Sequence, residues 1–505
     1  MIIFLKKHFN QFLLFLILFL AFFLRFYKLG QTPFGFFCDE ASIGYNSYSL
    51  IKHGSDEWGA NWPMFFKAFG EYKGPVMIYS SLPFVYLLGL NEFSVRLVSV
   101  LYGTAAILAV YLLSKQIFNS KIALLSSFFL AISPWHIHFS RVSLEGLTPF
   151  VFFTTLATYF WLIFIKKHKF GYLSVFLFSL AFYSYFPARI FIPLYFLSLF
   201  LSAYPSLKKD LSKLIKLFVF SLILITPMIF HLISGDGLSR WQQVKGNSNL
   251  LNLTKKYFEY FSPNFLFFQG DIGLTGQFIT RHSVKGMGEL YLIQLPLIIL
   301  GLIFFIKTKF KKEYLILFFW LLFYPFCDLF TLSISPQATR SLIGVLPFQI
   351  LSSVGVFQLL KLKKNKTYQI VTAFVLSLLI IFSINNFKKL YYQEYNLYSS
   401  DYWGWQSGPR EIMNYFKLHH QDYDRLCLEE KFNAPGIFIK FYDPNNLCQD
   451  KCQICQISSL NYNQKQLFAV SGKTFEQLDK STLNIKKIIN YPNQQPAFYL
   501  IDFVK

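Results

Sequence analysis

The chain has 505 residues, of which 54% are hydrophobic and only 15% are charged, and its mean hydropathy is +0.40. This composition is too apolar and too poor in charge for an ordinary soluble enzyme, so we expect a polytopic membrane protein. The formal net charge of +22 does not indicate a nucleic-acid partner, because the lysines occur in short clusters between apolar runs and not on a soluble basic face.

The first apolar segment, residues 9–26, follows Lys6 and Lys7 and lacks the small-residue cleavage site that ends a signal peptide. We therefore expect it to remain in the membrane as a helix with a cytoplasmic N-terminus. Ten further apolar segments follow: residues 94–118, 122–138, 147–165, 171–186, 190–204, 217–233, 290–306, 314–332, 341–360 and 368–387. Each is near the ~20 residues needed to cross a bilayer, so we predict about 11 transmembrane helices and a multi-pass protein of the plasma membrane.

Lysines gather in alternate loops between these segments, as the positive-inside rule expects of cytoplasmic loops. The short loops on the other side carry only isolated arginines, such as Arg141, Arg189 and Arg340. This asymmetry assigns four polar segments to the outer face: residues 27–93, 140–146, 234–289 and the chain after about residue 386. Residues 74–90 are also apolar, but as a span they would place the later lysines outside. We expect them to form a helix at the outer interface.

The last part of the chain, residues 389–505, is more polar than the rest. Its hydrophobic runs have the length of strands, as in GIFIKFY (436–442) and PAFYLIDFV (496–504). We interpret it as a small soluble extracytoplasmic α/β domain that follows a membrane domain of residues 1–388.

Four of the six cysteines lie in this C-terminal region: Cys427, Cys448, Cys452 and Cys455. An even set of thiols in an oxidising compartment favours disulfides, of undetermined pairing, over a zinc site. Cys38 and Cys327 are isolated, and we interpret them as small packing residues.

Two adjacent acidic residues, Asp39 and Glu40, open a predicted helix from Ala41 to about His53, which Gly54 would end as a C-cap. One interpretation is structural: Asp39 caps the helix, and Glu40 is a first-turn acid stabilised by the helix dipole. The other is chemical, because a carboxylate at an outer interface can accept the proton of an acceptor hydroxyl as it attacks a sugar C1. Residue types and spacing leave both open.

Several blocks, in this order, resemble one family: LRFYKLGQTPFGFFCDEASIGYNSYSLIKHGSDEWG, FFKAFGEYKGPVMIYSSLPFVYLLGLNEFSVRLVS, SPWHIHFSRVSLEG, FSPNFLFFQGD with RHS, and PQATRSLIGVLP. They cover about residues 10–390. By this resemblance the chain is identified as a member of the membrane GT-C glycosyltransferases, similar to bacterial dolichyl-phosphate-mannose-type protein O-mannosyltransferases and to the lipid A aminoarabinose transferase.

The resemblance implies a GT-C fold and a polyprenyl-phosphate-linked sugar donor. It also implies transfer to a hydroxyl of a protein, glycan or lipid acceptor outside the cytoplasm, with inversion at the anomeric carbon. No cofactor is predicted, although Asp39 with Glu145 could hold a divalent cation through hard oxygen ligands.

The family motifs also imply roles for individual residues. Asp39 is the candidate general base, Glu40 would orient the acceptor or sugar hydroxyls, and Lys73 would bind the donor phosphate. Arg141 and Glu145, in the second outer turn, would contact sugar or phosphate. Without the resemblance, Lys73 would be interpreted as a snorkelling lysine, and Arg141 with Glu145 as an exposed ion pair.

Three more residues, Arg281, His282 and Arg340, would complete the donor pocket, since an arginine fork suits a phosphate. The chain departs from the family at Gly74, where proline is frequent, and at Gln337, where histidine is common. We expect Gly74 to loosen the start of the interfacial helix, and Gln337 leaves donor preference and metal use open.

Three classes of function follow from these observations. A glycosyltransferase is favoured. A transporter or flippase for a lipid-linked sugar would use the same outer pocket without making a bond, and a non-catalytic subunit would act through its C-terminal domain. The identity of the sugar and of the acceptor is not encoded in a readable motif.

Overall fold

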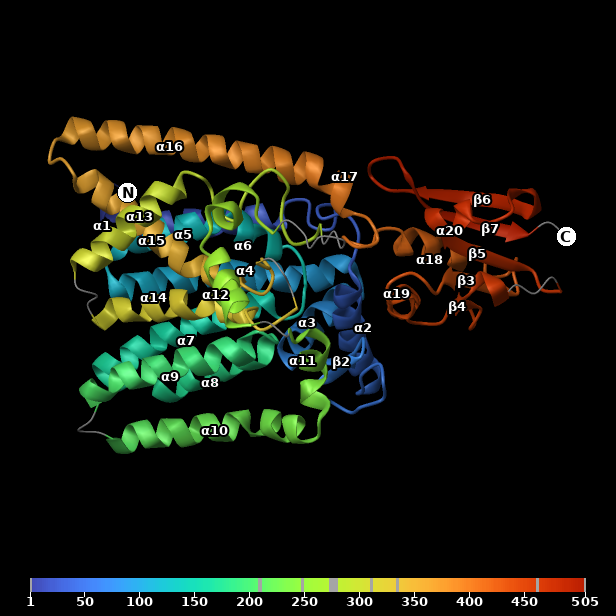
Figure 1. The fold of residues 1–505 in the computed structure, drawn as a ribbon, viewed down its shortest axis with the longest axis horizontal. Helices are drawn as coiled ribbons and strands as arrows, with labels where there is room; N and C mark the ends of the chain where they lie inside the picture. Colours follow the sequence, from blue (N-terminus) through green and yellow to red (C-terminus); the bar gives the residue numbers. More distant parts are fainter. Residues whose placement is uncertain are drawn as a thin grey trace.

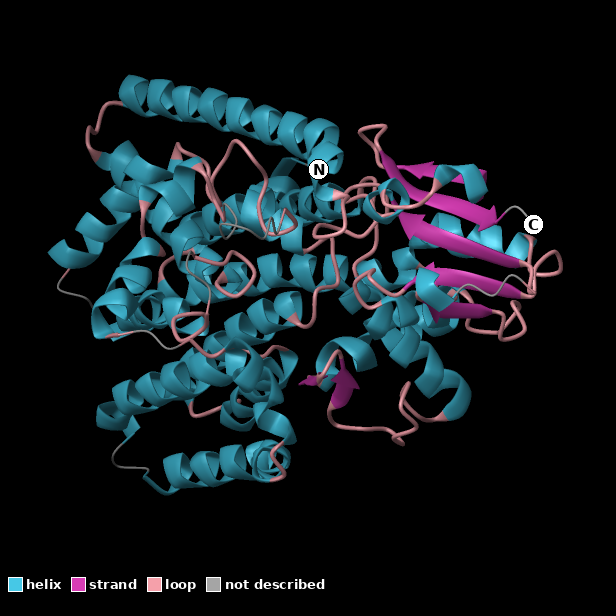
Figure 2. Ribbon diagram, turned by 45° about the vertical axis from the view of Figure 1, so that its right-hand side comes forward, coloured by secondary structure: helices cyan, strands magenta, loops and turns pink. Residues whose placement is uncertain are grey.

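The computed structural model describes residues 2–207, 211–246, 249–271, 280–308, 312–332, 336–459 and 463–503. In it, long apolar helices run side by side, and a five-stranded sheet lies beyond one end of the helical bundle (Figure 1). Figure 2 shows the same division from another side, with a short two-stranded hairpin near the bundle. The predicted fold class, a polytopic α-helical membrane protein with a C-terminal α/β region, is confirmed.

Every predicted span coincides with at least one apolar helix. These helices are α1 (Ile2–Phe26), α4 (Glu92–Ile117), α5 (Ser120–Ile132), α7 (Leu147–Lys167), α8 (Gly171–Ser184), α9 (Ala188–Leu207), α10 (Leu211–Ile233), α13 (Gln294–Lys307), α14 (Lys312–Phe323), α15 (Val345–Lys361) and α16 (Lys366–Lys389). Six described helices, namely α1, α4, α7, α10, α15 counted from Leu342, and α16, are long and apolar enough to cross a membrane. The other apolar helices are too short by this criterion over the described residues.

Two predicted spans are interrupted at prolines. Segment 122–138 consists of α5 and a separate short helix, α6 (Pro134–Phe139), because Pro134 has no N–H for the helix ladder and occupies the first position of α6. Segment 314–332 changes from α14 to a 3₁₀ turn, η4 (Tyr324–Cys327), which contains Pro325. The predicted boundaries were therefore too long at both places.

The two ends of the bundle differ, as the lysine pattern predicts. Helices α10 and α16 begin at the left of Figure 1, after loops that contain lysine clusters, and run toward the sheet. The elements of the predicted outer loops are α2 (Cys38–His53), β1 (Phe66–Ala68), β2 (Glu71–Lys73), α3 (Pro75–Leu88), η2 (Asp236–Leu238), α11 (Ser239–Val244), α12 (Leu250–Glu259) and η3 (Asn264–Phe268). Several of these elements, among them α2, α3 and α11, lie toward the opposite end in Figure 1. The first turn of the predicted span 341–360 is a 3₁₀ helix, η5 (Leu342–Gly344). Which end faces the cytoplasm stays a prediction.

Gly74 fixes the start of α3. A Cβ atom at this position would lie 2.0 Å from the carbonyl oxygen of Tyr183, so no side chain fits here without movement of the backbone. Pro75 then occupies the first helical position. The glycine therefore allows a close approach to α8 at this point, and the expectation that it loosens the helix start stays a prediction.

The chain after α16 continues through a π-helical turn into the C-terminal region. Its helices are η6 (Leu390–Glu394), α17 (Tyr395–Ser399), α18 (Pro409–Leu418), α19 (Pro435–Tyr442), η7 (Ile457–Ser459), α20 (Gly472–Glu476) and η8 (Lys480–Thr482). Its strands are β3 (Arg425–Glu429), β4 (Cys452–Cys455), β5 (Gln466–Ser471), β6 (Leu483–Asn490) and β7 (Pro496–Phe503), in the order β4-β3-β5-β7-β6. β3 is parallel to β4 and β5, whereas β7 is antiparallel to β5 and β6.

One predicted strand is a helix. The run PAFYLIDFV forms β7 as predicted, but GIFIKFY forms α19. Pro435 occupies the first turn of α19, and the buried side chains of Ile437, Phe438 and Phe441 share one face of the helix at helical spacing. This face packs α19 against α2, so the environment decides the conformation of a short apolar run.

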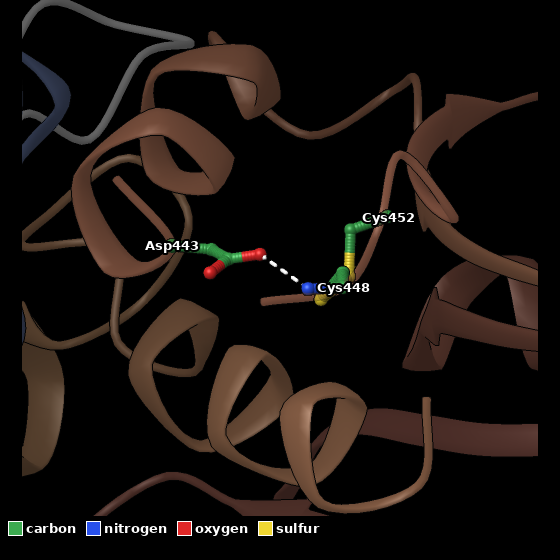
Figure 3. Close-up of side chains that lie close together, drawn as sticks. All are labelled: Asp443, Cys448 and Cys452. Carbon is green, nitrogen blue, oxygen red and sulfur yellow. Dashed lines mark hydrogen bonds between the residues drawn. A yellow bond between two sulfur atoms is a disulfide. The ribbon is translucent and has the colours of Figure 1, made fainter. Parts of the chain in front are cut away.

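The four C-terminal cysteines form two disulfides, Cys427–Cys455 and Cys448–Cys452, as the favoured interpretation predicts. Asp443 lies beside the second disulfide, and its carboxylate accepts a hydrogen bond from the backbone N–H of Cys448 (2.9 Å; Figure 3). A second N–H, from Leu447, donates to the same carboxylate (2.7 Å). Because both sulfurs are bonded to each other, this group is a loop-stabilising cluster and not a thiolate metal site.

Replacing both cysteines of a disulfide by alanine tests the contribution of each. The Cys427–Cys455 bond closes a loop of 28 residues and the Cys448–Cys452 bond a loop of 4. Loop-closure entropy therefore gives the longer loop the larger stabilisation, roughly 3–4 against about 2 kcal/mol. We expect the C-terminal region of the first double variant to become protease-sensitive at a lower temperature than that of the second. The reverse order contradicts the entropic account.

Candidate active site

Helix α2 begins at Cys38, earlier than predicted, so that Asp39 and Glu40 lie inside its first turn. The backbone N–H of Phe37 donates to Glu40 Oε2 (3.2 Å), which makes Glu40 the capping acid. Gly54 ends the helix in a left-handed conformation with φ 68°, as predicted. The cap that was proposed for Asp39 thus belongs to Glu40.

Glu40 forms a completely buried ion pair with Arg96 of α4. The Nε and Nη2 atoms of Arg96 donate to the two carboxylate oxygens at 2.9 and 2.8 Å, and the N–H of Ser143 donates to Oε1 at 2.9 Å. Both oxygens are therefore occupied, and Glu40 is not among the residues that line the cavity at Asp39. The prediction that Glu40 orients acceptor or sugar hydroxyls is corrected: Glu40 ties α2 to α4 and to the turn at residues 140–146.

Arg141 is also not where the family motif predicts it to act. Its guanidinium is completely buried and donates to the carbonyl oxygens of Leu24, Arg25, Lys28 and Thr32 at 2.8–3.2 Å. These carbonyls belong to the C-terminal end of α1 and the turn after it, where a cation is favoured by the helix dipole. Arg141 therefore caps α1 and contacts no cavity that holds the other predicted residues.

Five of the eight predicted site residues do meet at one cavity of about 200 Å³, whose lining comes largely from the predicted outer loops. They are Asp39, Glu145, Arg281, His282 and Arg340. The rest of the lining consists of Leu144, Leu147, Tyr185, Arg240, Gln337 and Thr339. The cavity thus combines two carboxylates with three arginines, an imidazole and several uncharged polar groups, contributed by segments far apart in the sequence.

Lys73, the sixth predicted residue, lies directly behind Asp39. It extends from β2, is almost completely buried, and forms an ion pair with the Asp39 carboxylate. Burial alone lowers the pKa of Lys73, but the carboxylates of Asp39, Glu145 and Glu71 outweigh it and raise the pKa above its usual value. Asp39 is partly exposed, whereas Lys73 is enclosed, so Lys73 fixes Asp39 at the cavity wall.

Arg240 is a site residue that the sequence did not single out. It stands in α11, lines the cavity, and its Nε lies 2.9 Å from Oε2 of Glu71 on β2. Burial and the neighbouring charge of Glu145 raise the pKa of Glu71 to about 7. Arg240 is one more isolated arginine in a predicted outer loop, so the charge pattern that marked Arg340 could also have marked Arg240.

Arg340 is held from behind by Asp328, a completely buried residue. Its Nη1 donates to Asp328 Oδ1 (2.5 Å) and to Thr331 Oγ1 (2.6 Å). Lys256 of α12 and the hydroxyl of Tyr260 lie at 3.0 and 2.7 Å from the other oxygen of Asp328. One buried carboxylate therefore anchors two cations, of which Arg340 reaches the cavity.

The donor residues predicted in the RHS motif are held by different partners. Arg281 donates to the carbonyl oxygen of Trp403 (2.6 Å), and its guanidinium lies over the ring of Phe37, 3.9 Å from the centroid. His282 Nδ1 lies 3.0 Å from Asp271 Oδ2, and burial lowers the pKa of His282 below its usual value. A neutral imidazole bonded to Asp271 through Nδ1 would present its other nitrogen as an acceptor.

A buried acid, Glu289, lies behind this motif. The hydroxyl of Ser283 donates to Glu289, and the N–H of Asp271 donates to Ser283 Oγ (2.7 Å). Burial raises the pKa of Glu289 to about 8. Asp271 precedes residues 272–279 and Ser283 follows them, so the bonds among Asp271, Ser283 and Glu289 connect the two sides of this loop. Asp271 in turn bonds His282 at the cavity.

Residues 72–231 match the family model for dolichyl-phosphate-mannose-protein mannosyltransferase. This segment runs from β2 to α10 and includes Lys73 and Glu145. Among curated proteins, no sequence matches the chain.

Solved structures of two kinds share the fold. ArnT from Cupriavidus metallidurans aligns at 12% identity in the apo state (TM-score 0.55) and at 11% when bound to undecaprenyl phosphate (TM-score 0.57). Each alignment covers 96% of this chain and 97% of ArnT. The Archaeoglobus fulgidus oligosaccharyltransferase with a tethered acceptor peptide aligns at 13% identity (TM-score 0.54), over 87% of this chain. The chain spans only 63% of that protein. The family-model match and these shared folds are consistent with the resemblance to GT-C glycosyltransferases that the sequence motifs predict, and the chain has the fold of these solved structures.

The raised pKa of Glu289 predicts a pH dependence of stability. Between its usual value of 4.5 and about 8, the folded protein keeps a proton that the unfolded chain releases, so Glu289 stabilises the fold at low pH and this contribution is lost as the pH rises toward 8. Replacing Glu289 by glutamine should flatten the decline of the melting temperature from pH 5 to 8. The exposed control Glu430→Gln should follow the wild type, and parallel curves for Glu289→Gln would contradict the buried-acid assignment.

Proposed function

We propose that this protein is a membrane glycosyltransferase that moves a sugar from a polyprenyl-phosphate-linked donor to an acceptor hydroxyl on the extracytoplasmic face, with inversion at C1. The observation that carries the proposal is the single cavity in which the partly exposed carboxylate of Asp39 faces the three arginines Arg240, Arg281 and Arg340. The family-model match and the shared fold with ArnT bound to undecaprenyl phosphate support it.

The arginines suit the donor phosphate. Each is anchored from behind, Arg240 by Glu71, Arg281 by the Trp403 carbonyl and Arg340 by Asp328. A guanidinium has five N–H donors, so an arginine that uses one or two of them to bond its anchor can donate the others to phosphate oxygens. Anchoring before the substrate arrives reduces the cost of ordering the side chains. Such a cradle stabilises the negative charge that collects on the departing polyprenyl phosphate.

The isoprenoid chain of such a donor needs an apolar surface. A cavity of about 330 Å³ between α8, α9 and α10 has a lining dominated by apolar side chains, among them Phe182 and Ile192. Tyr185 of the polar cavity lies three residues after Phe182. The two cavities are therefore close along the chain, which supports a donor with a charged head group and an apolar tail.

Asp39 serves the acceptor side of the reaction. Its carboxylate accepts the hydroxyl proton while the hydroxyl oxygen bonds to C1 and the bond from C1 to the phosphate oxygen breaks, so the electron pair leaves with the phosphate. Attack from the face opposite the phosphate inverts C1. Lys73 holds Asp39 in place for this step, and Glu145, on the same cavity wall, is positioned to contact sugar hydroxyls.

Substituting Asp39 by asparagine tests the base. Asparagine keeps the volume but cannot accept the proton, so we expect a loss of transfer of roughly 100-fold or more. Insertion in the membrane should not change, whereas the melting temperature should fall because the enclosed Lys73 loses its ion-pair partner, so transfer is compared at a temperature at which both proteins are folded. Purified protein is incubated with a panel of polyprenyl-phosphate sugars and acceptors, and products are identified by mass. Asp422→Asn, an exposed control, should keep full activity. Intact transfer by Asp39→Asn removes Asp39 from the reaction, and movement of an unaltered donor without product supports a flippase.

Substituting Arg240 by alanine tests the new cradle residue. Loss of one charge-assisted contact should lower kcat/KM for the donor roughly 10- to 100-fold. The effect should appear for every donor that carries the polyprenyl phosphate, whatever its sugar. The matched control Arg425→Ala removes a half-buried arginine of β3 whose side chain donates to Gln453 and does not line the cavity, and should leave the kinetics unchanged. Unchanged donor kinetics in Arg240→Ala would exclude Arg240 from the phosphate site.

A further inference from the structure

The segment after the last helix of the bundle packs directly against the loop that leads into α2. The side chain of Asn396 accepts from the N–H of Phe34 (3.0 Å) and donates to the carbonyl oxygen of Gln31 (2.8 Å). A Cβ at Gly35 would lie 2.4 Å from the carbonyl oxygen of Trp405, so the two backbones touch here. Residues 396–406, which we call the clamp segment, are therefore part of the wall behind Asp39.

Gln406 contacts Cys38, the residue before the candidate base. Its Oε1 accepts from the backbone N–H of Cys38 (2.9 Å), and its Nε2 donates to the carbonyl oxygen of Asn433 (3.0 Å). The side chain is buried with 1% exposure, and the residue has a φ of 51°, which is uncommon for a residue other than glycine. Packing on both sides holds Gln406 in this conformation.

The bonded N–H belongs to the first residue of α2. The first N–H groups of a helix have no partner within the helix, so an outside acceptor decides how firmly the first turn is held. Asp39 is the next residue. Loss of the Gln406 acceptor would therefore loosen the start of this turn at Cys38 and Asp39, while Glu40, the next residue in the same turn, stays bound to Arg96.

The same segment holds the donor side. The carbonyl oxygen of Trp403 accepts from Arg281, whose guanidinium also covers the ring of Phe37, the residue before α2. One stretch of chain thus touches both the helix start that carries Asp39 and an arginine of the phosphate cradle. Neither contact requires an acceptor to be bound.

We propose that Gln406 is a positioning residue for the transfer reaction: it holds the first turn of α2 so that Asp39 meets the acceptor hydroxyl, and the clamp segment completes the active site. The inference rests on the proposed function. It gives residues 389–505 a part in the chemistry itself, beyond any contact with the acceptor.

Gln406→Ala, made in a Cys327→Ser background, tests the proposal by two independent measurements. Cys38 is then the free thiol among the described residues, it is buried, and burial raises its pKa, so it should react slowly with maleimide. Loosening of the first turn should increase the rate of Cys38 labelling, measured by mass. A misplaced carboxylate should lower kcat roughly 10- to 100-fold, while KM for the donor stays within about twofold because the arginines remain.

Two further variants separate positioning from general stability. Ser407→Ala removes a buried hydrogen bond to the Ser400 carbonyl in the adjoining position without touching α2, and should change neither labelling nor kcat. Gln406→Glu keeps an acceptor for the Cys38 N–H, so its labelling rate and its kcat should be close to those of the wild type. If Gln406→Ala does not fold, the labelling rate and kcat of Gln406→Glu decide whether the acceptor holds α2.

Unchanged labelling or unchanged kcat in folded Gln406→Ala overturns the proposal, and so does a folded Gln406→Glu as impaired as the alanine variant. The labelling rate does not depend on turnover. If the wild type transfers no sugar, the proposed function fails, while labelling still decides whether Gln406 holds α2.

Discussion

The buried ion pair between Glu40 and Arg96 is the constraint on which the candidate site depends. It joins the first turn of α2 to α4, and the same carboxylate binds the N–H of Ser143. Two of the segments that build the cavity are thereby fixed relative to each other. Such a pair adds little net stability, because both charges lose their hydration, but breaking it leaves an uncompensated charge inside the protein. It therefore specifies one arrangement, in which Asp39, the neighbour of Glu40, faces the cavity.

The same physical rule shapes the rest of the site. Charges that are withdrawn from water need partners, and Lys73, Arg240 and Arg340 each have a carboxylate behind them. The partners lie on different elements from the cations, so each pair also joins two segments of the chain. A substrate phosphate would then meet cations whose positions are already fixed, so binding would not include the entropic cost of ordering their side chains.

The amino-acid sequence was enough to predict the order of helices and loops, but not which way individual side chains point. Apolar runs and lysine clusters predicted the spans and the segments at the outer end, because hydropathy and loop charge act locally. Of the residues that the family motifs predict for the site, Asp39 and Arg340 line the cavity. Arg141 instead caps α1, and Glu40 forms a buried ion pair with Arg96. Whether an arginine faces a cavity or a carbonyl depends on packing between distant segments, which no local pattern records. Arg240, by contrast, is an isolated arginine in a predicted outer loop, like Arg340. The charge pattern contains it but does not distinguish it from arginines that lie away from the cavity.

The boundary predicted at residue 388 divides the chain by composition, but the contacts do not follow it. The rings of Phe36 and Phe441 meet at 4.9 Å, Arg410 forms an ion pair with Glu92, and one continuous core of buried side chains contains residues from both parts. A region that only recruited an acceptor would need contacts at its own surface and a flexible connection. Here the polar segment nearest the membrane helices is bonded to the start of α2. Its composition marks it as soluble, whereas its hydrogen bonds make it part of the wall on which Asp39 depends.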